Sequence, residues 1–276
     1  TAAGSTLSVA GGVNTGSNAL TLSALGALTT SGVGTLTGGA TSLSGGSITL
    51  GALVNSTVLT LASAGSVTQG AAFTTGALTL TGGGTFVLNG QDNVFTSLTT
   101  GMGNANSIDV RNTGMTSLSV GPVTTTAALT VNSTASGLSV DGAVSTGGAT
   151  SLVAGAGALA VNASVMTGGN ALTLSATGAL SSDTAGTLTA GTTSLTGNGI
   201  TLGGAVTTTG ATTLSAGAGN IALNAAVNAG TNALTLTTTG TADQMAAFTA
   251  GALTLNGVGG TYNLGGQANA FTSVTT

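Results

Sequence analysis

The sequence predicts an all-β fold: a parallel β-solenoid (right-handed β-helix) of about 13 coils, each of 20–23 residues. Three observations lead to this prediction. Aliphatic residues alternate with Thr or Ser in many short segments, Gly and Asn separate these segments, and long stretches of the chain repeat one another. Right-handed winding is expected because parallel crossover connections have this hand in nearly all proteins.

The composition excludes several other fold classes. Charged residues make up 2% of the chain, against about 25% in an average domain. Disordered chains combine low hydrophobicity with high net charge, whereas this chain is 41% hydrophobic with a net charge of −4. A single proline and the lack of a Gly-X-Y period exclude collagen. Helices are disfavoured because Lys and Glu are absent and β-branched residues are abundant.

The strand signal is the alternation of Leu, Ile or Val with Thr. A period of two places the aliphatic side chains on one face of a strand and the hydroxyls on the other. Gly, Asn and Ser between the segments supply the backbone conformations of tight turns. Typical segments are Leu20–Leu22, Leu59–Leu61, Leu78–Leu80, Leu172–Leu174, Leu234–Leu236 and Leu253–Leu255.

Long-range repetition distinguishes a solenoid from a globular β-protein. Residues 18–54 align without gaps to residues 170–206, with about two-thirds of the positions identical. Residues 69–100 match residues 244–276 at a larger offset, so the second unit carries 23 additional residues. Such an insertion would disrupt a globular core, but it adds one coil to a solenoid, in which each repeat contacts only its neighbours.

The predicted organisation is therefore one β-solenoid over residues 1–276. Within it, residues 2–100 match residues 154–276, and the extra coil is expected near residues 207–229. With strands about 4.8 Å apart, the coils would form a rod about 60 Å long.

Several sequence blocks resemble a known family. GALTL, GTLTAGTTSLTGNGITLGGAV and TTLSAGAGNIALN are similar to the repeats of filamentous haemagglutinin-type large exoproteins and related autotransporter passengers. The resemblance covers nearly the whole chain. It implies a secreted β-helical stalk on the surface of a Gram-negative bacterium.

The functional expectation is an extracellular structural or adhesive segment of a bacterial surface fibre or large adhesin. No polar cap is visible at Thr1 or Thr276, and unpaired strand edges require a partner. The expected partners are copies of the chain, or continuing coils, that stack end to end through the open ends, together with glycans or proteins of host or neighbouring cells. An ice- or glycan-binding solenoid is the alternative, because Thr-x-Thr pairs such as Thr35 and Thr37 occur, though irregularly.

Enzymatic activity and cofactors are not expected. The five aspartates are far apart, and no His, Lys or Glu is present to assist them. No metal site is predicted, because Gly82–Gly84 lacks the Asp of a calcium repeat and zinc ligands are absent. Nucleic acid is excluded by the single basic residue, Arg111, which is expected to form a weak surface pair with Asp109. No apolar run approaches the length of about 18 residues that a membrane span needs.

The aromatic segments are the most distinctive feature. All six aromatic residues and all four glutamines lie in the two matching segments, 69–100 and 244–276. One interpretation is that these coils have a wider interior and need larger side chains. The other is an interaction patch on an exposed loop beside a packed Phe; Ala268 replaces Asp92 there, so charge is not essential to it. The candidate patch consists of Gln91, Asn93 and Phe95, and of Gln267, Asn269 and Phe271.

Overall fold

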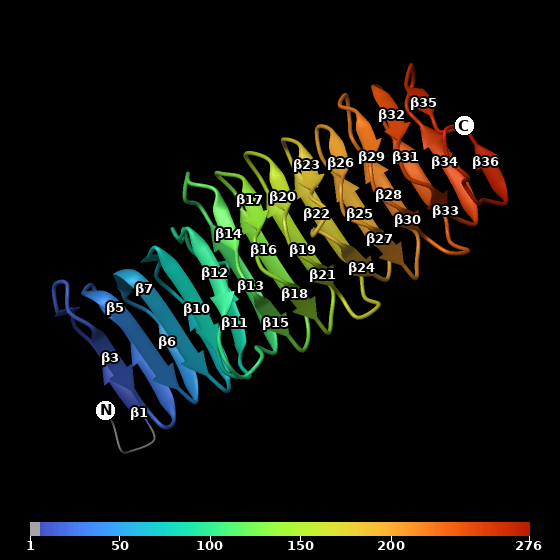
Figure 1. Cartoon of the computed structure of the whole chain (residues 1–276). Helices are drawn as coiled ribbons and strands as arrows, with labels where there is room; N and C mark the ends of the chain where they lie inside the picture. Colours follow the sequence, from blue (N-terminus) through green and yellow to red (C-terminus); the bar gives the residue numbers. More distant parts are fainter. Residues whose placement is uncertain (1–5) are drawn as a thin grey trace.

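The computed structural model describes residues 6–276, which form a single parallel β-solenoid (Figure 1). Successive coils stack along one axis, with the first and last coils at opposite ends of an elongated rod. No helix occurs in these residues. The predicted fold class is confirmed.

Three stacked sheets run along the rod. The first has 14 strands: β1 (Thr6–Val9), β4 (Ala27–Thr30), β6 (Ser47–Leu50), β8 (Ser66–Gln69), β11 (Thr85–Leu88), β13 (Ser107–Asn112), β16 (Leu129–Ser133), β19 (Thr150–Ala154), β22 (Leu172–Ala176), β25 (Thr193–Thr196), β28 (Thr212–Ser215), β31 (Leu234–Thr237), β34 (Ala252–Asn256) and β36 (Ser273–Thr275). It is called sheet 1 below.

Sheet 2 has 15 strands, and sheet 3 has seven. Sheet 2 contains β2 (Val13–Asn14), β3 (Leu20–Ser23), β5 (Thr35–Gly45), β7 (Leu53–Ser63), β9 (Phe73–Thr74), β10 (Ala77–Thr81), β12 (Ser97–Thr100), β14 (Leu118–Val120), β17 (Leu138–Val140), β20 (Leu159–Val161), β23 (Leu180–Ser182), β26 (Ile200–Leu202), β29 (Ile221–Leu223), β32 (Thr241–Gln244) and β35 (Thr261–Asn263). Sheet 3 contains β15 (Val123–Thr125), β18 (Val144–Thr146), β21 (Val165–Met166), β24 (Leu188–Ala190), β27 (Val206–Thr208), β30 (Val227–Asn228) and β33 (Phe248–Thr249).

The coil length follows from the strand register. Val67 pairs with Phe86, 19 residues further on, and Thr150 pairs with Leu172, 22 residues further on. Coils of 19 residues are slightly shorter than the predicted range. One reason is visible in β7, an 11-residue strand in which the chain passes from one face to the next without a turn.

The core is a set of aliphatic columns along the axis. In sheet 1, Leu28, Ile48, Val67 and Phe86 are successive register partners, and each is at most 1% exposed. Burying a side chain of this size contributes about 1.5–3 kcal/mol. Because strand residues alternate between faces, the intervening positions place Thr, Ser and Asn on the outside of the rod.

Matching segments of the two large repeats lie on different sheets. Leu20 of β3 is in sheet 2, whereas its equivalent Leu172 is in sheet 1; Leu28 is in sheet 1, whereas its equivalent Leu180 is in sheet 2. The change occurs after β12, where β13 follows the loop 101–106 and stacks on β11, while β14 continues from β12. The repeat has thus turned by one face of the coil.

Candidate functional site

The first aromatic segment fills the interior of the rod. Phe73 and Phe95 lie on neighbouring coils, with ring centroids 5.8 Å apart, and each is 1% exposed. Phe86 is fully buried on the facing sheet. These rings pack as core side chains, as the interpretation of a wider interior predicts.

A buried amide pair accompanies the rings. Asn93 Nδ2 donates to Gln69 Oε1 over 3.0 Å, and Gln69 Nε2 donates to Asn93 Oδ1 over 2.9 Å. Asn93 also donates to the Leu88 carbonyl (2.7 Å) and accepts from the Phe73 amide (3.2 Å). The side chain of Asn93 therefore provides partners for backbone groups that are shielded from water.

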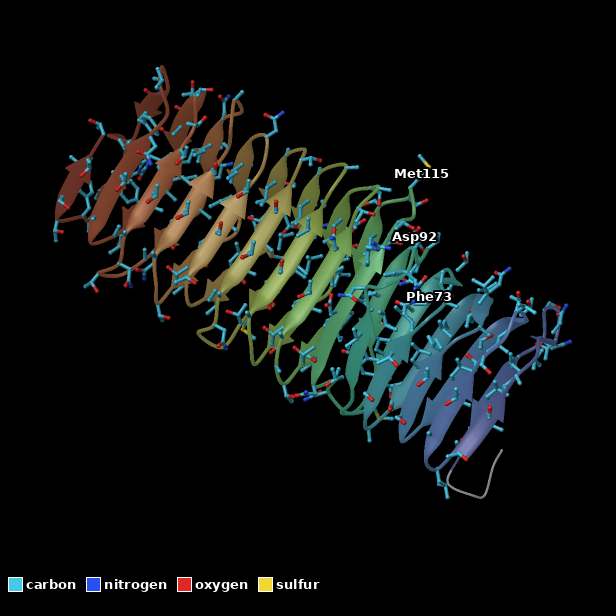
Figure 2. The ribbon with its side chains drawn as sticks, turned by 180° about the vertical axis from the view of Figure 1, so that it is seen from behind. Phe73, Asp92 and Met115 are labelled. Atoms are coloured by element: carbon cyan, nitrogen blue, oxygen red, sulfur yellow. The ribbon has the colours of Figure 1, made fainter. Side chains whose placement is uncertain are left out.

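The prediction that Asn93 lies on an exposed loop is wrong, because this residue is fully buried. Phe95 is equally inaccessible, which removes both residues from any contact surface around the first segment. Gln91 is partly exposed, and its neighbour Asp92 projects from the edge of the rod, near the exposed Met115 (Figure 2).

The second aromatic segment repeats this network. Gln244 and Asn269 exchange two hydrogen bonds of 2.9 and 2.8 Å. Asn269 also donates to the Leu264 carbonyl (2.7 Å) and accepts from the Phe248 amide (3.0 Å). The pairing escaped prediction, although the confinement of all four glutamines to the two matching segments was a signal for it.

The second segment differs in its exposure. Phe271 stacks on Phe248 at 5.8 Å but is 43% exposed, and Asn269 is partly exposed. Gln267 is exposed. These three candidates lie in the last described coil, where no further coil covers them.

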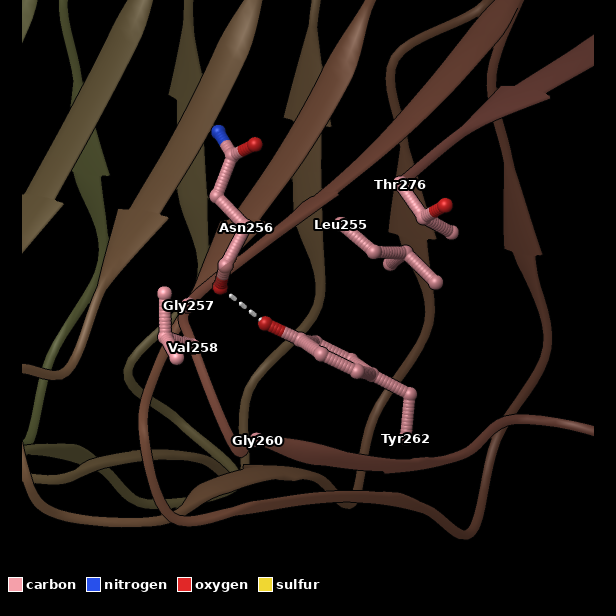
Figure 3. A pocket seen from close by; sticks show the side chains of 7 residues that line it. All are labelled: Leu255, Asn256, Gly257, Val258, Gly260, Tyr262 and Thr276. Atoms are coloured by element: carbon pink, nitrogen blue, oxygen red, sulfur yellow. Dashed lines mark hydrogen bonds between the residues drawn. The ribbon is translucent and has the colours of Figure 1, made fainter.

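The coil at this end leaves core residues open. Leu255, Tyr262 and Leu264 are only partly buried, and Val274 is 54% exposed. A hollow of about 390 Å³ lies here, lined by residues that include Leu255, Tyr262 and Thr276 (Figure 3). The Tyr262 hydroxyl lies within hydrogen-bonding distance of the Asn256 carbonyl, so the phenol at this level satisfies a backbone group.

The single ion pair in residues 6–276 differs from the predicted one. Arg111 Nη2 contacts Asp92 Oδ1 of the preceding coil at 2.6 Å, and its Nε donates to the Gln91 carbonyl. Asp109 instead accepts a hydrogen bond from Asn89 (2.5 Å). Burial raises the pKa of Asp109, and the hydrogen bond from Asn89 partly offsets this effect.

Asp141 lies at the centre of an exposed polar ladder. It accepts hydrogen bonds from Ser119 (2.6 Å), Ser139 (2.7 Å) and Asn162 (2.8 Å). The hydrogen bond from Ser119, supported by those from Ser139 and Asn162, lowers the pKa of Asp141, and partial desolvation opposes it. In residues 6–276, no cluster of three potential metal-ligating His, Cys, Asp or Glu side chains occurs. None of the elements in this range is a helix of the length and apolarity that a membrane span requires.

Comparison with known proteins locates one similarity. Residues 38–101 match a protein family described as repeats of unknown function (DUF5649). The matched range includes the first aromatic segment and the Gln69–Asn93 pair. No curated protein matches the chain, and no solved structure matches it.

Proposed function

We propose that this chain is an extracellular structural or adhesive rod, a segment of a bacterial surface fibre or large adhesin that is extended by stacking end to end. The observation that carries the proposal is the open last coil, where Phe271 is 43% and Val274 is 54% exposed. Equivalent side chains within the rod are covered by the next coil: Phe95 is 1% exposed and Leu98 is fully buried.

Physical properties of the rod support a mechanical role. Continuous parallel ladders connect successive coils, so separating two coils requires breaking hydrogen bonds on several faces together. A net charge of −4 produces little repulsion between approaching ends. The resemblance to exoprotein repeats supports placement outside the cell, on a Gram-negative surface.

Negative-stain electron microscopy of the purified 276-residue chain across a concentration series tests this function. Uniform filaments that lengthen with concentration are expected. Discrete rods of about 60 Å at every concentration would refute end-to-end extension.

A second candidate function is ice or glycan binding, which two adjacent columns of hydroxyls on sheet 1 favour. Register pairs β22, β25, β28 and β31, which places one column beside the other on the outer surface. The columns consist of Thr173, Ser194, Thr213 and Thr235, and of Ser175, Thr196, Ser215 and Thr237. Measuring thermal hysteresis and binding to a glycan array, with Thr213→Val as the variant, tests this candidate. A chain inactive in both assays would exclude it.

A further inference from the structure

We infer that the open C-terminal coil is the docking site for the N-terminal coil of a second copy of this chain. In the docked arrangement, Asn14 and Thr15 of the second copy occupy the places that Asn112 and Thr113 hold within the rod. The inference rests on the proposed end-to-end assembly and adds to it the register, the face and the residues of the contact.

The internal precedent is the coil that covers the first aromatic segment. Thr113 donates to the Asn93 carbonyl through both its backbone amide (2.7 Å) and its hydroxyl (3.1 Å). The Phe95 amide donates to Asn112 Oδ1 over 3.0 Å. One Asn-Thr dipeptide therefore completes the hydrogen bonds of the buried Asn93 and Phe95.

The same groups are open in the last coil. Asn269 and Phe271 correspond to Asn93 and Phe95 in sequence, in their amide pair and in their stacked ring. Within residues 6–276, no hydrogen bond reaches the Asn269 carbonyl, and the Phe271 amide has no acceptor. The end is thus an unfinished copy of a boundary that is complete inside the rod.

The N-terminal coil carries the matching residues. The tripeptide Asn-Thr-Gly occurs twice in the sequence, at 14–16 and at 112–114. At both positions the Asn Oδ1 accepts from the Gly amide two residues later, over 2.8 Å at Gly16 and 3.2 Å at Gly114. A Leu of sheet 2 follows at the same distance in both cases, as Leu20 and Leu118. The two turns therefore share a local geometry.

The order of faces also matches. By the large repeat, β1, β2 and β3 correspond to β20, β21 and β22, which lie in sheets 2, 3 and 1. The last strands of those sheets, β35, the bridge at Ala270, and β36, form the exposed end. In this register Leu7, Val9 and Val13 of the second copy, which are only partly buried, cover Tyr262, Leu264 and Phe271.

One geometrical consequence follows from this register. Equivalent segments lie one face apart in the two halves of the chain, because Leu28 is in sheet 1 and Leu180 in sheet 2. Stacking that keeps equivalent faces in column therefore turns each copy by one face relative to the copy before it. A filament would present its hydroxyl columns on a new side in each successive subunit.

Disulfide cross-linking tests the register directly, since the chain has no cysteine. Inside the rod, the Thr113 amide bonds to the Asn93 carbonyl, so Thr113 stacks over Val94, and Thr15 of a second copy should stack over Ala270. Neighbouring strands are about 4.8 Å apart, within the about 4.4–6.8 Å between Cα atoms that a disulfide spans. The ends of one rod are about 60 Å apart, so the bond forms only between copies.

The experiment compares two double variants under oxidising conditions. Thr15→Cys with Ala270→Cys is expected to give a ladder of covalent oligomers on a non-reducing gel. Thr15→Cys with Asn263→Cys, which places the second thiol on another face of the same end, is expected to stay monomeric. A ladder from the second variant, or filaments that neither variant cross-links, would overturn this register while leaving end-to-end assembly intact. Single rods at every concentration would refute both.

A pair of alanine variants supplies an independent test. Asn228 forms the same turn as Asn14, accepting from the Gly230 amide over 2.9 Å, but it lies in an inner coil. Asn14→Ala is expected to raise the concentration at which half of the chains are in filaments by about fivefold or more. Asn228→Ala, which loses the same local turn, is expected to leave that concentration unchanged. Equal effects of the two variants would contradict a role for Asn14 in docking.

Discussion

The buried Asn93 side chain is the polar group on which the aromatic coils depend most. Asn93→Ala removes its hydrogen bonds and leaves the Gln69 amide oxygen, the Phe73 amide and the Leu88 carbonyl without their side-chain partner. Three unpaired groups at about 1–1.5 kcal/mol each give an expected loss of about 3–5 kcal/mol. This is a large effect for one substitution.

Asn269→Ala is the matched control, because Asn269 makes the same contacts in the last coil. Water reaches that coil, so the groups left unpaired can be hydrated, and the expected loss is about 1 kcal/mol. The comparison separates the effect of burial from the effect of the hydrogen bonds themselves.

Hydrogen exchange is the suitable assay, since long repeat arrays do not unfold in a single two-state transition. The opening free energy of the amides in residues 66–112 should fall by about 3–5 kcal/mol in Asn93→Ala. Amides of the first coils should be little affected, because each coil contacts only its neighbours. A loss below about 1 kcal/mol, or equal losses for Asn93→Ala and Asn269→Ala, would refute the reasoning.

Three further predictions concern the core, the ion pair and pH. Phe95→Ala should cost about 3–5 kcal/mol and Phe271→Ala less than about 1 kcal/mol in the opening free energy of their coils, because only the first ring is enclosed; equal values would contradict this. Arg111→Ala should change the thermal midpoint by no more than the equivalent of about 1 kcal/mol, because its partner Asp92 is 79% exposed; a larger drop would show that the pair is a structural anchor. The pKa of Asp141 is lower in the folded state, so its stabilisation is present above about pH 4 and is lost as pH falls through the folded-state pKa. Asp141→Asn should therefore flatten the acid side of a melting-temperature profile, and an unchanged profile would exclude this contribution.

Much of the fold is predictable because its strands follow a simple alternation. Leu78 and Leu80 are fully buried, and Thr79 between them is not, as a period of two requires. The role of large side chains as fillers was also accessible, since the aromatic residues are confined to two segments. The coil length was predicted to within one residue at either limit.

The remaining features depend on contacts between coils, which a single sequence does not reveal. Asn93 follows Gln91 and Asp92 in a stretch typical of an exposed turn, and its burial depends on Gln69 from the preceding coil. The turn of the repeat by one face depends on the short loop after β12, because equivalent segments have nearly the same sequence on either side of it. Arg111 pairs with Asp92 across coils for the same reason: register, and not proximity in sequence, brings them together.

Electron cryo-microscopy of filaments grown from the purified chain tests the central claim most directly. With 13 steps between the strands of sheet 1 and one further face at the junction, the account predicts an axial repeat of about 60–65 Å at ~4.8 Å per coil. Each subunit should be turned by one face relative to the next. Filaments with another axial repeat, or built from rods associated side by side, would contradict the account.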